Sequence, residues 1–350
     1  MPRNTQVTID ADAIRHNLAR VREWAPQSKV MAVVKADAYG HRLDLSVPAL
    51  ADADLLAVAT LEEARAIRRL GITQGIVLLE GVSHSGDLMV VAELGLELVV
   101  HHEHQLQMLE AFGQSPAKRI WIKIDSGMHR LGFAPEAAPS VFRRIEALSG
   151  LQAINWISHF ASADSSAEVT QAQMARFDQV VGHFPGAQCL ANSAAIIQTP
   201  ESHRDWVRAG IVLYGISPLA NTSGAELGLK PAMTVQSELI AINDVSAGES
   251  IGYGGRFVAA TDLVVGVVAI GYGDGYPRAM RDGAPVLLNG TRCPLVGRVS
   301  MDMITIDLSS AENPRIGDLV TLWGDELSVE EVAHWADTIP YELVCRMTRR

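Results

Sequence analysis

The sequence predicts an α/β protein in which an N-terminal (β/α)8 barrel precedes a C-terminal, mostly antiparallel β domain. Three observations support this prediction. Eight short apolar runs alternate with amphipathic segments over the first two thirds of the chain, and polar residues follow most of those runs. Beyond about residue 230, glycine-rich turns separate short β-branched runs. A chain of 350 residues is also long enough for two hydrophobic cores.

The eight apolar runs are expected to be parallel strands, because continuous apolar runs are typical of strands covered on both faces. They span residues 30–34, 55–58, 75–79, 96–100, 120–124, 154–157 and 187–190, and the last surrounds Val207. Segments between them show helical spacing, as in Ile14, Leu18, Val21 and Trp24, which share one helix face. Eight such units in about 200–250 residues match the length of a (β/α)8 barrel.

The pattern of apolar and turn-forming residues changes near residue 230. Runs at 263–270, 303–308 and 319–323 are separated by tight-turn sequences such as Asn289-Gly290. We therefore assign residues 11–230 to the barrel and 231–350 to the β domain. Residues 1–10 are a candidate addition to the second domain, since their strand-like segment 6–9 precedes the first helix.

Composition narrows the range of functions. The formal net charge of −11 disfavours binding to nucleic acids or anionic membranes. Cys189, Cys293 and Cys345 lie far apart without metal-ligand spacing, which predicts reduced thiols and no metal site. The first residues lack the apolar core of a signal peptide, and no apolar run is long enough to span a bilayer, so we expect a cytoplasmic protein.

Polar side chains close six of the eight predicted strands. Barrel enzymes place their catalytic groups at the carboxyl ends of the strands. A single polar residue there means little, because polar residues end most strands, but six in one series favour a functional site. They are Lys35, Thr60, Asp125, His159, Asn192 and Arg208.

Lys35 ends a buried apolar run and is followed by small residues, which is an unusual position for a merely solubilising charge. Burial disfavours the ammonium form and suits a lysine that forms a Schiff base or carries a proton. The alternative is a lysine whose stem packs at the barrel rim while its ammonium group reaches water.

Two segments are candidates for binding anions. Asn192-Ser193 follows the seventh strand and Arg208 lies in the eighth, the region where (β/α)8 barrels commonly bind phosphate. Asn192-Ser193 is also a typical helix N-cap, and Arg208 is equally suited to a structural ion pair. Arg130 carries the planar fork that grips a carboxylate, although a solvated loop is the commoner explanation for such a charge cluster.

Taken together, the motifs resemble the alanine racemase family along nearly the whole chain. Tyr253 and the segment 270–278 would in isolation suggest ordinary hairpin turns with aromatic packing. The resemblance is specific because separate motifs occur in the family's order. They are residues 35–41, 123–132, 158–164, 191–194, 208–215, Tyr253, 270–278 and 297–302.

The resemblance implies an isomerase that interconverts L- and D-alanine on pyridoxal 5′-phosphate (PLP), for peptidoglycan synthesis or for alanine catabolism. Lys35 would hold PLP as a Schiff base and exchange the α-proton on the D-alanine face. Tyr253, supplied by the other subunit of a homodimer, would act on the L-alanine face. Racemisation needs one base on each face of a planar carbanion, and a phenol needs cationic surroundings to serve as one.

The same resemblance implies the other site residues. Arg208 would face the pyridine nitrogen, where a guanidinium cannot accept a proton and so limits delocalisation of the carbanion. Arg130 and the backbone of Met301 would bind the substrate carboxylate, and Tyr272 and Tyr341 would narrow the entrance. Lys123 matches a position often carried as a carbamate. The remaining cofactor contacts would come from Tyr39, His159, Asn192, Ser193, Gly210, Ile211 and Tyr341.

Two other functions share part of this pattern. A PLP-dependent decarboxylase of basic amino acids shares the barrel lysine, but the Tyr253 segment and Arg208 match the racemase pattern. A non-catalytic PLP-binding barrel would lack the roughly 120 residues that follow the predicted barrel. This chain departs from the family at Arg42, where glycine usually follows His41, and over the rest of the segment 42–48.

Overall fold

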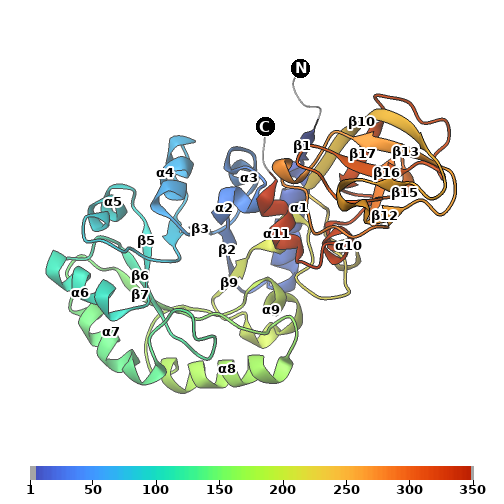
Figure 1. Ribbon diagram of the computed structural model, residues 1–350. Coiled ribbons are helices and arrows are strands. Elements are labelled where there is room, and N and C mark those ends of the chain that lie inside the picture. The colour runs from blue at the N-terminus through green and yellow to red at the C-terminus, as the bar shows by residue number, and fades with distance from the viewer. Residues whose placement is uncertain (1–4, 348–350) are drawn as a thin grey trace.

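The computed structural model describes residues 5–347 and confirms the predicted fold class. Eight parallel strands form a closed barrel (Figure 1). They are β2 (Lys29–Val33), β3 (Leu55–Val58), β4 (Ile76–Leu78), β5 (Glu97–Val100), β6 (Arg119–Lys123), β7 (Ala153–Ile157), β8 (Gln188–Cys189) and β9 (Trp206–Ala209). β2 pairs with both β3 and β9, which closes the ring.

Strand alternation divides the apolar residues between two cores. Met31 and Val33 of β2 join Trp121 and Trp206 in a cluster of inward-facing side chains that fills the barrel. Val30 and Ala32 belong to the larger cluster between the strands and the surrounding helices. Those helices include α1 (Ala11–Trp24), α4 (Leu61–Arg69), α5 (Asp87–Glu93), α6 (Glu103–Phe112), α7 (Ala138–Glu146), α8 (Ala167–Val181) and α9 (Ser193–Gln198).

The predicted apolar face of the first helix is confirmed, with Ile14, Leu18 and Val21 buried and Trp24 packed at its edge. The seventh barrel strand is shorter than expected. The Ala187 N–H donates to the side chain of Asn155 and the Gln188 N–H donates to that of Asp205. Side-chain oxygens therefore take the place of ladder partners at that end. None of the helices within residues 5–347 is both long and apolar enough to cross a membrane.

The C-terminal domain is built on a seven-stranded antiparallel sheet whose longest strand is β10 (Met233–Val245). β1 (Gln6–Ile9) pairs with β10 and so joins this sheet, although the helix that directly follows it, α1, packs on the barrel (Figure 1). The other strands of the sheet are β13 (Leu263–Val268), β14 (Pro285–Leu288), β15 (Thr291–Pro294), β16 (Ile304–Asp307) and β17 (Leu319–Trp323). A separate hairpin of β11 (Ser250–Ile251) and β12 (Phe257–Val258) carries Tyr253 at its turn.

The chain makes a left-handed helical turn directly after Lys35. Four consecutive residues without a glycine, from Ala36 to Tyr39 in α2 (Lys35–Tyr39), have φ between 52° and 56°. Left-handed helix costs an L-residue about 1–2 kcal/mol, so surrounding contacts must offset roughly 4–8 kcal/mol here. The hydroxyl of Tyr214 supplies one such contact by donating to the Val33 carbonyl, 3.0 Å away, just before the turn.

Two short helices bring the C-terminal part of the chain back to the barrel mouth. They are α10 (Val329–Trp335) and α11 (Pro340–Arg346), and α11 lies beside α2 (Figure 1). A Cβ at Gly40 would lie 2.0 Å from the Val344 carbonyl oxygen, and Gly40 has φ +77°. Only glycine permits this approach, which places Tyr341 of α11 near Tyr39 of α2.

Candidate active site

A cavity of about 1230 Å³ opens at the carboxyl ends of the barrel strands. Ten of the thirteen site residues expected from the sequence line it, although they come from elements spread over most of the chain. They are Lys35, Tyr39, Arg130, His159, Asn192, Ser193, Arg208, Gly210, Ile211 and Tyr341. Their convergence follows from the barrel, because parallel strands present all their carboxyl ends at one rim.

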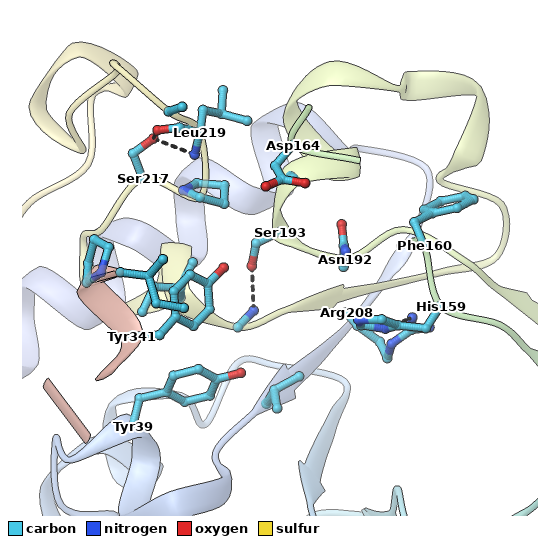
Figure 2. A pocket seen from close by; sticks show the side chains of 18 of the residues that line it. Tyr39, His159, Phe160, Asp164, Asn192, Ser193, Arg208, Ser217, Leu219 and Tyr341 are labelled. Carbon is cyan, nitrogen blue, oxygen red and sulfur yellow. Dashed lines mark hydrogen bonds between the residues drawn. The ribbon is translucent and has the colours of Figure 1, made fainter. Parts of the chain in front are cut away.

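One side of the cavity is a cradle of hydroxyl groups around Gly210. The hydroxyls of Tyr39, Ser193 and Tyr341 come from three different elements and surround the same space (Figure 2). The Gly210 N–H donates to Ser193 Oγ at 2.9 Å. A Cβ at Gly210 would lie 2.9 Å from the Tyr39 hydroxyl oxygen. The absence of a side chain at Gly210 therefore keeps this polar corner open.

If the cavity holds PLP, as the resemblance implies, replacing Gly210 with alanine is expected to weaken PLP binding by about tenfold or more, because the added methyl displaces the Tyr39 hydroxyl. The PLP dissociation constant, from titration of the apoprotein by absorbance, checks this. Gly86→Ala is the matched control, since a Cβ at Gly86 meets no atom within 4 Å and should leave PLP binding unchanged. Equal PLP affinity for the two variants would show that the cradle at Gly210 does not hold the cofactor.

Arg208 forms the opposite wall, and its guanidinium is tied to the backbone. Nη1 donates to the Cys189 carbonyl at 3.0 Å, while Nη2 donates to the carbonyls of Ser158 at 2.6 Å and Leu190 at 3.1 Å. Nη2 also lies 3.0 Å from Nδ1 of His159. Because arginine can only donate, Nδ1 is the acceptor in this contact, and Nη2 shares its two N–H groups among three acceptors. The pKa of His159 is held well below its usual value by burial and then by the charge of Arg208.

Four cationic side chains, Lys35, Lys123, Arg130 and Arg208, act on one another in the cavity. Burial, followed by the charges of Arg208, Arg130 and Lys35, lowers the pKa of Lys123 to about 8. Such a concentration of positive charge is unusual in a chain with a net charge of −11. It favours a ligand with several negative charges, such as a phosphate together with a carboxylate.

Two of the polar strand ends have supporting positions instead of cavity positions. Thr60 caps α4 by accepting the Glu63 N–H. Asp125 Oδ1 accepts the N–H groups of Gly127, Met128 and His129 at 3.0 to 3.1 Å. That carboxylate shapes the loop that carries Arg130. Asp125 therefore contributes to the site by positioning this loop and does not line the cavity itself.

Tyr253, Tyr272 and Met301 do not line the cavity of their own chain. They lie in the C-terminal domain and are 71%, 38% and 50% exposed. Tyr272 and Met301 are neighbours, because the Tyr272 N–H donates to the Ser300 carbonyl and the Gly273 N–H donates to the Met301 carbonyl. The structure thus separates these three residues from the other ten.

The cavity also has walls that the sequence reasoning missed. Leu79 and Glu80 line it directly after β4, a strand end for which no polar residue was proposed. The segment 217–223 covers another side, and its position depends on Glu330 of α10, whose Oε1 accepts the N–H groups of Ser217 and Gly224. Glu80 follows the predicted strand 75–79 directly, so it could have been found as a polar residue at a strand end. Nothing local marks the segment 217–223.

Arg42, the departure noted in the sequence, lies at a φ of +64° that favours glycine. Its guanidinium forms a two-pronged ion pair with Asp44, with Nε–Oδ1 at 3.1 Å and Nη2–Oδ2 at 2.6 Å. Glycine adopts this conformation without strain, and in this chain Arg42 adopts it together with a local ion pair to Asp44.

Comparison with known proteins identifies the family. The model of the alanine racemase N-terminal domain matches residues 9–218, and that of the C-terminal domain matches residues 232–350. The chain belongs to the alanine racemase family.

Curated members of the alanine racemase family match this chain over its full length. The alanine racemase of Shewanella piezotolerans is 49% identical over 98% of this chain and 96% of its own length. That of Nitrosococcus oceani is also 49% identical, over 99% and 97%. Among solved structures, the biosynthetic alanine racemase of Pseudomonas aeruginosa has a TM-score of 0.95 and 45% identity, covering 99% of this chain and 97% of that one.

Proposed function

We propose that this chain interconverts L-alanine and D-alanine with PLP as cofactor, using Lys35 and Tyr253 as bases on opposite faces of the substrate. The observation that carries the proposal is the meeting of Lys35 with the hydroxyl cradle at Gly210 in one cationic cavity. Supply of D-alanine for peptidoglycan is the role such an activity serves, with alanine catabolism as the second candidate.

The residues present fit PLP. Its phosphate matches the cradle of Tyr39, Ser193 and Tyr341, where a Cβ at residue 210 would crowd the Tyr39 hydroxyl. Arg208 lies across the cavity, and the hydrogen bonds of its Nη1 and Nη2 atoms fix its orientation. We propose that its third nitrogen, Nε, faces the pyridine nitrogen of PLP. His159 and Asn192 complete this wall. Lys35 supplies an amine at the end of β2 to hold the cofactor's aldehyde carbon.

PLP, when bound, withdraws electrons from the substrate and makes its α-proton easier to remove. The chain then has three tasks. Arg130 binds the substrate carboxylate and fixes which faces of the α-carbon are accessible. The Nζ atom of Lys35 removes or returns the proton on the D-alanine face. The hydroxyl oxygen of Tyr253 does the same on the L-alanine face.

Tyr253 and Met301 would reach the cavity from a partner subunit in a homodimer. Supporting this, both side chains are at least half exposed in this chain, and the same domain also exposes Tyr272 and Met303, and exposed side chains of this kind are suited to burial against another protein. The Met301 N–H and Arg130 would together hold the substrate carboxylate.

We also propose a domain boundary near residue 230, with residues 5–10 in the second domain. The last barrel strand ends at Ala209, β10 begins at Met233, and β1 pairs with β10. The outermost residues of the ranges expected from the sequence, 1–4 and 348–350, lie outside the described part of the chain.

Truncating Tyr341 is expected to relax substrate size. Tyr341 lines the cavity with its ring centre 6.1 Å from that of Tyr39, so Tyr341→Ala widens the cavity and also removes one hydroxyl of the cradle. We expect the ratio of kcat/KM for serine to that for alanine to rise about tenfold. Racemisation rates on both amino acids check this, with Tyr276→Phe as a control remote from the cavity. An unchanged ratio would remove Tyr341 from the selectivity of the site.

The function itself is tested by incubating the purified chain and PLP with L-alanine and following both enantiomers by chiral chromatography. We expect convergence to equal amounts of L- and D-alanine, with slower conversion of L-serine. If PLP binds while L-alanine stays unchanged, the proposed function is wrong.

A further inference from the structure

The left-handed turn that follows Lys35 needs an anchor at its first residue. Ala36, Asp37, Ala38 and Tyr39 all have φ near +54°, a conformation that L-residues disfavour. Within the turn, the Ala38 N–H donates to the Val34 carbonyl and the Gly40 N–H donates to the Ala36 carbonyl, both at 2.9 Å. These bonds leave open what holds Ala36 itself, which directly follows Lys35.

Glu63 of α4 holds Ala36. Its Oε1 accepts the Ala36 N–H at 2.6 Å, across the gap between the loops that follow β2 and β3. At the far end of the turn, Asp37 Oδ1 accepts the Leu43 N–H at 2.8 Å. A carboxylate oxygen that accepts an N–H makes a charge-assisted bond, stronger than a neutral one. Glu63 of another helix therefore holds the start of the turn, and Asp37 of the turn itself binds the segment that follows it.

The second oxygen of Glu63 is fixed as well. Oε2 accepts the N–H groups of Ala59 at 2.8 Å and Thr60 at 3.2 Å, in the capping box of α4. The carboxylate therefore links the segments that follow two neighbouring barrel strands, because β2 and β3 are paired (Figure 1). A group that only capped α4 would not need to reach Ala36.

We propose that Glu63 is a positioning residue for Lys35: by holding the Ala36 N–H it stabilises the left-handed turn and fixes where the lysine side chain enters the cavity. Lys35 and Tyr39 occupy the two ends of that turn and both line the cavity, so the turn also sets the spacing between the amine and the hydroxyl cradle. The inference rests on the proposed function in assigning Lys35 to the cofactor.

The test compares Glu63→Gln with two matched controls. Glutamine has the same shape but a single acceptor oxygen, so it serves either α4 or Ala36 and turns an N–H donor toward the other. Glu62→Gln removes an equal charge from the same first turn of α4 at an exposed position. Thr60→Val removes the hydroxyl that caps α4 and leaves the contact between Glu63 and Ala36 in place.

We expect Glu63→Gln to weaken PLP binding about tenfold and to lower kcat by a similar factor, since small displacements of a reacting group are costly. The KM for alanine should change little, because Arg130 lies on a different loop. The visible circular dichroism band of bound PLP should shrink, and neither control should reproduce these changes. The PLP measurements need no turnover, so they report on Glu63 even if the wild-type chain fails to racemise alanine.

A rescue experiment separates the turn from the helix cap. Glycine adopts φ near +54° without strain, so adding Ala36→Gly to Glu63→Gln should restore PLP affinity and the dichroism band toward wild-type values. Two results would overturn the proposal. One is a Glu63→Gln variant that matches Glu62→Gln in PLP affinity, and the other is a Thr60→Val variant that reproduces the Glu63→Gln defects.

Discussion

Replacing Lys35 with alanine is expected to abolish racemisation, with a loss in kcat of about 10⁴-fold or more, because one amine both holds the cofactor and moves a proton. PLP should also become removable by dialysis. Lys29→Ala is the matched control: Lys29 begins β2, the strand that leads to Lys35, and so lies at the opposite end of the barrel, with its ammonium group over the Trp206 ring. Chiral analysis of alanine gives the readout.

Lys123 is the rival for the role of Lys35. It lines the same cavity, and its pKa of about 8 gives it a larger fraction of reactive free amine at neutral pH than an ordinary lysine has. Trapping bound PLP with borohydride and mapping the labelled peptide distinguishes the two lysines. Label on Lys35 supports the proposal. Label on Lys123, or a Lys35→Ala variant that still racemises alanine at the wild-type rate, would contradict it.

Replacing Tyr253 with phenylalanine is expected to lower racemisation by about 10³-fold while PLP stays bound, because only the base on the L-alanine face is lost. The two faces then behave differently. In deuterated water, the variant should still exchange the α-proton of D-alanine through Lys35, and should exchange that of L-alanine hardly at all. Nuclear magnetic resonance of the two substrates measures both exchanges.

Tyr276→Phe is the control for this prediction, since it removes a hydroxyl from the same domain. Within the described residues, the buried Tyr276 hydroxyl has no hydrogen-bond partner, so its loss should leave both exchange rates unchanged. Equal loss of exchange from D- and L-alanine in Tyr253→Phe would show that Tyr253 does not serve one face alone.

The barrel was predictable because its strands are short continuous apolar runs that alternate with segments of helical spacing. The same order along the chain placed Lys35, His159, Asn192 and Arg208 near one rim, and the structure brings them to one cavity. Their chemical roles remain predictions. The pairing of β1 with β10 had only a weak signal, the position of a strand-like segment before the first helix.

The left-handed turn at Ala36 to Tyr39 had no signal in the sequence, because positive φ is normally marked by glycine and here is imposed by contacts from outside. The role of Glu63 could not be predicted either, because its local sequence indicates only a helix cap. The position of Tyr253 relative to the cavity depends on a second subunit, which no local pattern specifies.

The most direct test of a two-base site shared between subunits is a heterodimer of two defective chains. Lys35→Ala and Tyr253→Phe subunits carrying different affinity tags are co-expressed and purified over both tags in succession. One of the two sites then combines an intact Lys35 with an intact Tyr253, so the heterodimer should recover about half of the wild-type racemisation rate. A doubly tagged heterodimer as inactive as its parent homodimers would contradict the shared site.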